Sequence, residues 1–167
     1  MKLVVADTGP LLHIHQAGAL HLFGLVGEVQ VTPTVMAELR RHAPKLWADG
    51  FPEWLQLVHP SSNAIARAAQ RTAGGLLDAG EAESLAYADE TKPDMFVTDD
   101  ASARLMADSL SVPARGSLGI VLFCAARGSL SQQDAEQHLA ALTAKTTLWL
   151  SARVKLEAAR ALAEIFR

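Results

Sequence analysis

Short apolar runs alternate along the chain with longer stretches in which apolar positions recur at helical spacing. The runs Leu3–Ala6 and Met95–Thr98 contain Val and are too short for helices, which favours buried strands of a parallel sheet. Similar runs predict strands at 29–31, 54–58 and 112–114. The alternation predicts an α/β fold with a parallel sheet of four to five strands, covered by helices on both faces and joined by right-handed crossovers.

The helices are placed by their apolar stripes and by the residues that begin and end them. Thr32 and Pro33 are typical of an N-cap and a first helical position, and they precede the inward stripe Val35, Met36 and Leu39. Residues 72–75 are predicted to be a loop because they contain Gly74 and Gly75. Further helices are predicted at 11–17, 19–26, 61–71, 79–91, 101–110, 117–126, 131–145 and 148–167.

Acidic residues follow both of the clearest strands. Asp7 comes directly after the first, and Asp99 and Asp100 come after the second. Ligands bind beyond the carboxyl ends of the strands in open α/β sheets, so these carboxylates are expected at one edge. In the alternative interpretation, Asp7 only caps the helix that follows it.

Two glutamates are expected to reach the same edge from helices. Glu38 lies beside the apolar stripe of its helix and is expected to point toward the sheet. Glu81 shares a helix face with Leu85 and Ala88, whereas Glu83 falls on a face that is mostly polar, so Glu81 is the better inward candidate. Glu81 is alternatively a first-turn acid that satisfies the helix dipole.

Converging carboxylates repel one another and raise some of their pKa values unless a cation is present. Oxygen ligands without Cys or His at metal-ligand spacing indicate Mg²⁺ or Mn²⁺ rather than zinc. Such an ion suits phosphodiester hydrolysis, because it activates water and stabilises charge on the phosphate. Neither a P-loop pattern nor a nucleotide-binding GxGxxG follows any predicted strand.

The composition is that of an ordinary globular domain of 167 residues, 50% apolar and 20% charged. The single cysteine, Cys124, lies in an apolar run and is expected to be a core thiol, which fits a reducing cytoplasm. No signal peptide or membrane span is evident, so a cytoplasmic protein is expected. A net charge of −3 means that nucleic acid would have to be attracted by a local basic rim or a metal.

The chain contains four short motifs, which are Val5–Leu12, Pro33–Leu39, Gly80–Ala86 and Val97–Asp100 with Arg104 one turn later. In this order and with this spacing, they resemble the PIN domain family of metal-dependent ribonucleases, best known as toxins of bacterial and archaeal toxin-antitoxin pairs. The chain is most similar to a PIN-like subgroup with a Gly-Glu-Ala-Glu stretch. The resemblance covers roughly residues 2–130 and implies a Rossmann-like three-layer PIN domain over 1–130, with 131–167 as a helical extension packed on it.

The resemblance implies roles for individual residues. It places the family's catalytic acids on Asp7, Glu38, Glu81 and Asp100, with Asp99 as the alternate to the last. The implied ligands of Mg²⁺ or Mn²⁺ are Asp7, Glu81 and Asp100, and the implied substrate contacts are Thr8, Asp99 and Arg104. Glu81 departs from the family pattern, since Asp is usual there and Glu is longer by a methylene.

The resemblance further implies an endoribonuclease that cleaves RNA and is blocked by a cognate antitoxin. Homodimers are common among these toxins. A phosphatase with an aspartate nucleophile fits less well, because Gly9 stands where a second Asp is needed. A catalytically weak or inactive module that binds protein or nucleic acid is the remaining alternative. His13 and His15 are set aside as site residues, while phosphate contacts are sought among Arg40, Arg41, Lys45, Arg104 and Arg115.

Overall fold

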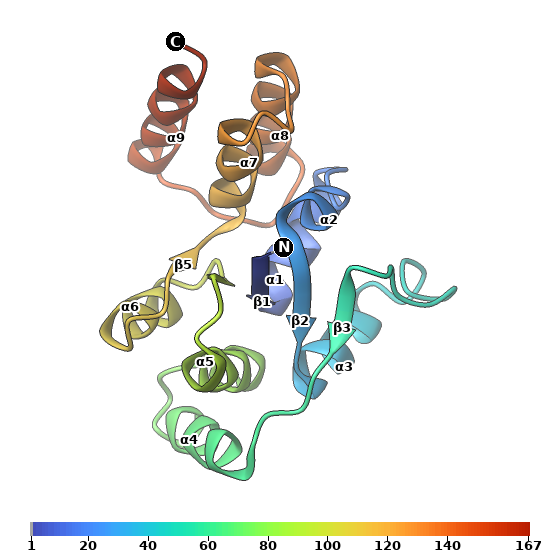
Figure 1. Ribbon diagram of the computed structural model, residues 1–167, viewed down its shortest axis with the longest axis vertical. Helices are drawn as coiled ribbons and strands as arrows, with labels where there is room; N and C mark the ends of the chain where they lie inside the picture. The colour runs from blue at the N-terminus through green and yellow to red at the C-terminus, as the bar shows by residue number, and fades with distance from the viewer. Residues whose placement is uncertain (1) are drawn as a thin grey trace.

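The computed structural model describes residues 2–167 and is built around a five-stranded sheet in which all strand pairs are parallel (Figure 1). The strand order is β3-β2-β1-β4-β5. The predicted α/β class and parallel sheet are confirmed. The strands are β1 (Lys2–Ala6), β2 (Gly27–Val31), β3 (Leu55–Leu57), β4 (Met95–Val97) and β5 (Ala114–Arg115).

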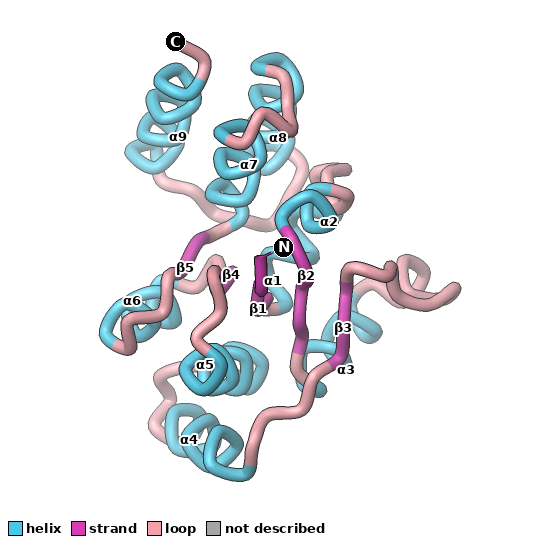
Figure 2. The backbone as a smooth tube through the Cα atoms, in the orientation of Figure 1, coloured by secondary structure: helices cyan, strands magenta, loops and turns pink. Residues whose placement is uncertain are grey.

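Helices surround this sheet, as the cyan segments around the magenta strands in Figure 2 show. The helix α3 begins at Pro33 with Thr32 as its N-cap, and α5 and α7 have the predicted bounds. The helices are α1 (Thr8–Gln16), α2 (Leu22–Val26), α3 (Pro33–His42), α4 (Ser62–Ala73), α5 (Ala79–Thr91), α6 (Ala101–Ser109), α7 (Ser117–Ala126), α8 (Gln132–Ala144) and α9 (Ala152–Ile165).

Side chains that alternate along the strands divide the interior into two cores. Val4 and Ala6 of β1 face a core that α1, α2, α3 and α7 cover, whereas Val5 faces a second core against α4, α5 and α6. In β4, Phe96 joins Val5 in the second core, and its two neighbours face the first. Both faces of the sheet are therefore covered, which explains why the strands are almost continuously apolar.

The last two helices pack onto the first core. Ala135 and Leu142 of α8 are fully buried in it, and Leu162 of α9 is 3% exposed there. Cys124 is a buried core thiol, as expected, and burial raises its pKa to about 11. Within residues 2–167, no helix is long and apolar enough to cross a membrane.

Several predicted boundaries are wrong. The helix α1 begins at Thr8 rather than near residue 11, and β5 lies at Ala114–Arg115 rather than at 112–114. The helix α2 is only five residues long and begins at Leu22 rather than near residue 19. The helix α4 continues through Thr72 and Ala73, which were expected in a loop. The last helix begins at Ala152, because residues 148–151 form a loop instead of its first turn. That loop crosses the carboxyl edge of the sheet and reaches the site described next.

Candidate active site

The strand order reverses between β1 and β4. The chain runs from β1 to β2 and β3 on one side and then returns to place β4 on the other side of β1. Asp7 follows β1, Asp99 and Asp100 follow β4, and the amide of Asp7 donates to the carbonyl of Val97 at 2.9 Å. The acids that the sequence placed at one edge thus lie at the switch point, where open α/β sheets bind ligands.

A cavity of about 460 Å³ opens at this edge. All four acids predicted to be catalytic line it, together with two of the three predicted substrate contacts. We call it the acidic cavity. Its lining residues are Asp7, Thr8, Gly9, His13, Glu38, Arg41, His42, Asp78, Gly80, Glu81, Asp99, Asp100, Thr147, Leu148 and Trp149.

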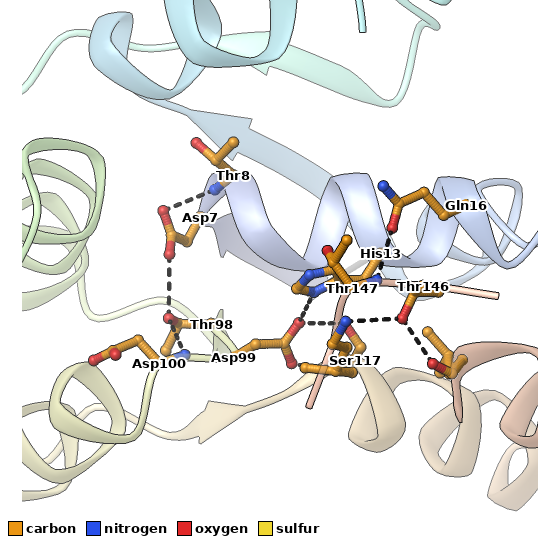
Figure 3. Close-up of polar contacts among 12 residues, drawn as sticks. Asp7, Thr8, His13, Gln16, Thr98, Asp99, Asp100, Ser117, Thr146 and Thr147 are labelled. Carbon is orange, nitrogen blue, oxygen red and sulfur yellow. Dashed lines mark hydrogen bonds and ion pairs between the residues drawn. The ribbon is translucent and has the colours of Figure 1, made fainter. Parts of the chain in front are cut away.

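Asp7 is the most buried of these acids, with 4% of its surface exposed. Its Oδ1 accepts a hydrogen bond from the amide of Thr8 at 2.7 Å, and its Oδ2 accepts one from the hydroxyl of Thr98 at 3.2 Å (Figure 3). Burial, reinforced by the negative charges of Glu81 and Glu38, raises the pKa of Asp7 from 3.8 to about 7. Asp7 therefore caps α1 and also lines the cavity, and its predicted catalytic role stays a prediction.

Glu81 occupies the first turn of α5, where its Oε2 accepts a hydrogen bond from the amide of Asp78 at 2.9 Å. Burial raises its pKa, and the neighbouring charges of Asp100, Asp78 and Glu38 add to the effect. The charge of Glu81 in turn helps to raise the pKa of Asp7. Like Asp7, Glu81 acts as a helix cap while facing the site.

Glu38 reaches the cavity from α3 and packs directly over the start of α5. The hydroxyl of Thr8 donates a hydrogen bond to its Oε2. A Cβ atom at Gly80 would lie 2.6 Å from that oxygen, so only glycine leaves room for the carboxylate. Thr8 thus positions Glu38, a role that the sequence did not indicate; the predicted contact of Thr8 with substrate stays a prediction.

The adjacent residues Asp99 and Asp100 have different surroundings. Asp99 Oδ1 accepts from the amide of Ser117 at 2.7 Å, and its Oδ2 contacts the hydroxyl of Ser117 at 2.6 Å and His13 Nδ1 at 2.7 Å (Figure 3). Asp100 uses only Oδ1, which accepts from the amide of Ala103 at 2.7 Å at the start of α6. Of the two, Asp100 has the freer carboxylate, because Asp99 makes three polar contacts, whereas Asp100 accepts one hydrogen bond at its side chain within residues 2–167.

His13 is a cavity residue that sequence reasoning set aside. Its partner Asp99 is 86 positions away, so no local spacing could reveal the pair. The bond to Asp99 fixes the orientation of the imidazole ring at the wall of the cavity.

The helix face of Glu83 is not the solvated surface that the sequence suggested. Glu83 accepts hydrogen bonds from the amide of Thr34 at 3.3 Å and from its hydroxyl, at the first turn of α3. Tyr87, on the same side of α5, is buried and donates to Gln30 Oε1 at 2.8 Å. Glu83 therefore serves the packing of α5 against α3, which leaves Glu81 as the acid that faces the cavity.

The basic residues differ in whether they line the acidic cavity. Arg41 lines the acidic cavity, whereas the guanidinium of Arg40 lies 5.2 Å from the ring centre of Phe51. Arg104 is half-buried, and its Nη1 donates to the carbonyl of Thr98 at 3.1 Å. The cationic groups closest to the acids are thus few, as the sequence suggested.

The donor set suits a hard divalent cation. Within residues 2–167, one carboxylate oxygen each of Glu38, Glu81 and Asp100 accepts no hydrogen bond from a protein group, and none of these acids forms an ion pair. No group of three or more acidic, His or Cys side chains in this part of the chain is arranged to hold a metal on its own. Mg²⁺ usually keeps several waters and takes only one or two carboxylates, so the residues fit such an ion better than they fit zinc or calcium.

Three helix N-termini help the fold to tolerate these charges. Asp7 begins α1, Asp78 and Glu81 begin α5, and Asp100 begins α6. The positive end of each helix dipole stabilises the carboxylate beside it. For Asp7, however, burial and the neighbouring acids outweigh this effect, as the raised pKa shows.

Fold and cavity together define an α/β protein with a carboxylate-lined cavity at the switch point of a parallel sheet. The model of the PIN domain family matches residues 3–164, nearly the whole chain and including α8 and α9. The chain therefore belongs to the PIN domain family, whose members are generally nucleases that use divalent metal ions. No curated protein matches the chain.

Proposed function

We propose that this protein is an endoribonuclease that depends on Mg²⁺ or Mn²⁺ and hydrolyses RNA phosphodiester bonds. One observation carries the proposal: four carboxylates from four segments line one cavity at the switch point, with the most buried of them held near a pKa of about 7 by burial and by its acidic neighbours. Such a cluster is stable with all groups ionised only if a cation joins it.

The roles follow from the contacts. Asp7, Glu81 and Asp100 would hold the ion, directly or through water, while Glu38 borders the site and is positioned by Thr8. Mg²⁺ or Mn²⁺ bound there would lower the pKa of a water molecule and neutralise charge on the scissile phosphate. Arg41 lies at the wall of the cavity, where its guanidinium can bind a phosphate oxygen, and Asp99 holds His13 in place.

A cleavage assay tests the proposal. Purified protein is mixed with labelled single-stranded RNA in Mg²⁺, in Mn²⁺ and in EDTA, beside the variants Asp7→Asn and Asp100→Asn. We expect cleavage that requires the metal and is lost in both variants. Cleavage that persists in EDTA, or that survives both substitutions, would exclude this mechanism.

A second candidate follows from the absence, within residues 2–167, of a preformed three-ligand metal group. The protein would then be a catalytically weak or inactive PIN module that acts by binding protein or nucleic acid. RNA binding without cleavage, unchanged in Asp7→Asn, supports this candidate over the nuclease.

The proposed biological role is the toxin of a type II toxin-antitoxin pair that acts in the cytoplasm. Its partners would be RNA, a cognate antitoxin protein and a second copy of the chain as a homodimer. Membership of the PIN domain family supports this role, since the family is best known for such toxins. Expression should arrest bacterial growth, co-expression of the protein from an adjacent small reading frame should relieve the arrest, and Asp7→Asn should be harmless.

A further inference from the structure

A second groove adjoins the acidic cavity. It has a volume of about 370 Å³ and shares Asp99, Leu148 and Trp149 with that cavity. We call it the tryptophan groove. Because the two hollows share a wall, a polymer whose phosphate lies among the carboxylates can continue into the groove. Its other lining residues include Ala101, Arg104, Leu118, Leu150, Ser151 and Val154.

Trp149 is a large apolar side chain placed in solvent, with 82% of its surface exposed. The backbone that carries it is held in position. The amide of Thr147 donates to Gln16 Oε1 of α1 at 3.4 Å, and the amide of Leu148 donates to the hydroxyl of Thr146 at 3.1 Å (Figure 3). An aromatic face presented beside a groove is the surface on which unpaired bases stack.

Arg104 supplies the positive charge of the groove. Its guanidinium is anchored by the carbonyl of Thr98, and within residues 2–167 no carboxylate forms an ion pair with it. Asp99 is the acidic residue among those that line the groove, and Ser117 and His13 occupy its oxygens. A planar guanidinium fixed in this way has donors to offer to a phosphate.

We propose that the tryptophan groove is a nucleotide subsite that selects single-stranded nucleic acid, with a base stacked on Trp149 and the adjoining phosphate bound by Arg104. The bound nucleotide would lie next to the phosphate in the acidic cavity. Its position relative to that phosphate therefore rests on the proposed function. A paired base in a duplex already stacks on its neighbours and cannot lie on the indole. The continuity of the groove with the acidic cavity and the free guanidinium favour a nucleic acid over a protein as the occupant.

The test separates stacking from simple apolar burial. Binding of a fluorescent single-stranded oligoadenylate is measured by anisotropy in low salt. EDTA is present, so that binding is measured independently of cleavage. We expect Trp149→Leu to raise the Kd about 10-fold and Trp149→Phe, which keeps a ring, to raise it about 3-fold or less. Arg104→Gln should also weaken binding and reduce its salt dependence. The matched control is Leu105→Ala, because Leu105 is 73% exposed on α6 but lines neither hollow.

The outcomes distinguish this inference from the nuclease proposal. If the wild type binds in a Trp149-dependent way but never cleaves, the subsite stands and the nuclease proposal fails. If the wild type cleaves and Trp149→Leu changes neither Kd nor KM, the subsite is wrong. An equal loss of affinity in the Trp149→Leu and Trp149→Phe variants, or equal binding of duplex and single strand, would also overturn it. If Trp149→Leu changes only the oligomeric state in light scattering, the groove is a protein interface instead.

Discussion

The acidic cavity and the tryptophan groove share a wall and differ in nearly everything else. The cavity is lined by six carboxylates, with Asp7 buried among them, and the groove by apolar side chains, one anchored guanidinium and an exposed indole. Asp99 belongs to both, and its oxygens contact Ser117 and His13. Under the two proposals the regions divide the work: the cavity would hydrolyse a phosphodiester bond, and the groove would hold the neighbouring nucleotide.

The largest effect that tests this division is expected at Asp7. Asp7→Asn should lower RNA cleavage at least about 100-fold, because weakening even the residues that support a metal ligand costs 10- to 100-fold. Oligonucleotide binding in EDTA should be retained, since the groove is untouched. Parallel measurements of cleavage and anisotropy check this. Equal loss of cleavage and of binding would break the division between the two regions.

The raised pKa of Asp7 predicts a second effect, on stability. The folded protein holds a proton with a pKa of about 7, whereas the unfolded chain has the ordinary 3.8. The folded state therefore binds more protons between these values, and stability falls as pH rises through about 7. Between pH 5 and pH 8 in EDTA, the free energy of unfolding should fall by about 2–3 kcal/mol.

Asp7→Asn isolates this contribution, because Asn cannot ionise. Urea unfolding at several pH values should show a smaller decline for the variant, which should be more stable than the wild type at pH 8. If the free energy of unfolding depends on pH in the same way in both proteins, the account of Asp7 as a buried acid with a raised pKa is contradicted.

A smaller effect is expected from Gly80→Ala. The added Cβ would lie 2.6 Å from Glu38 Oε2 and must displace that carboxylate, which should slow cleavage about 10- to 100-fold without unfolding the protein. The double variant with Glu38→Ala provides the control, since the clash no longer exists there. Losses that simply add in the double variant would show that Gly80 acts in some other way.

The smallest effect should separate Glu83 from Glu81. Glu83→Gln removes the negative charge beside the first turn of α3. It should lower the free energy of unfolding by about 1 kcal/mol and leave cleavage unchanged. Glu81→Gln should instead reduce cleavage, because Glu81 faces the cavity. Thermal unfolding and cleavage assays on both variants check this, and a cleavage defect confined to Glu83→Gln would reverse the assignment.

The elements and the acids at the strand ends were predictable from the sequence because their signals are local. The runs around Val4 and Phe96 mark strands, and the Thr32-Pro33 pair marks the start of α3. Once β1 and β4 are recognised as parallel neighbours, Asp7 and Asp100 must lie at one edge. Helical periodicity also put Glu81 on the face of α5 that lines the cavity, while its catalytic role stays a prediction.

The remaining features depend on contacts between distant segments. His13 is held at the wall of the cavity by Asp99, which is distant in the sequence. Glu83 was placed on a mostly polar helix face, but that face is covered by α3. Leu148 and Leu150 fit a helical pattern, yet they line the groove from a loop. The periodicity of a short apolar stretch does not show whether it is buried in a helix or used at a site.

The most direct test of the central claim is a calorimetric titration of Mn²⁺ into the metal-free protein at pH 8, with Asp7→Asn in parallel. If the carboxylates share a cation, the wild type will bind one ion per chain at pH 8, where Asp7 is already largely ionised. At pH 5.5 it will bind the ion more weakly and release protons as Asp7 ionises. The variant will bind at least about 10-fold more weakly. The same affinity in both proteins, or no binding in either, would contradict the claim.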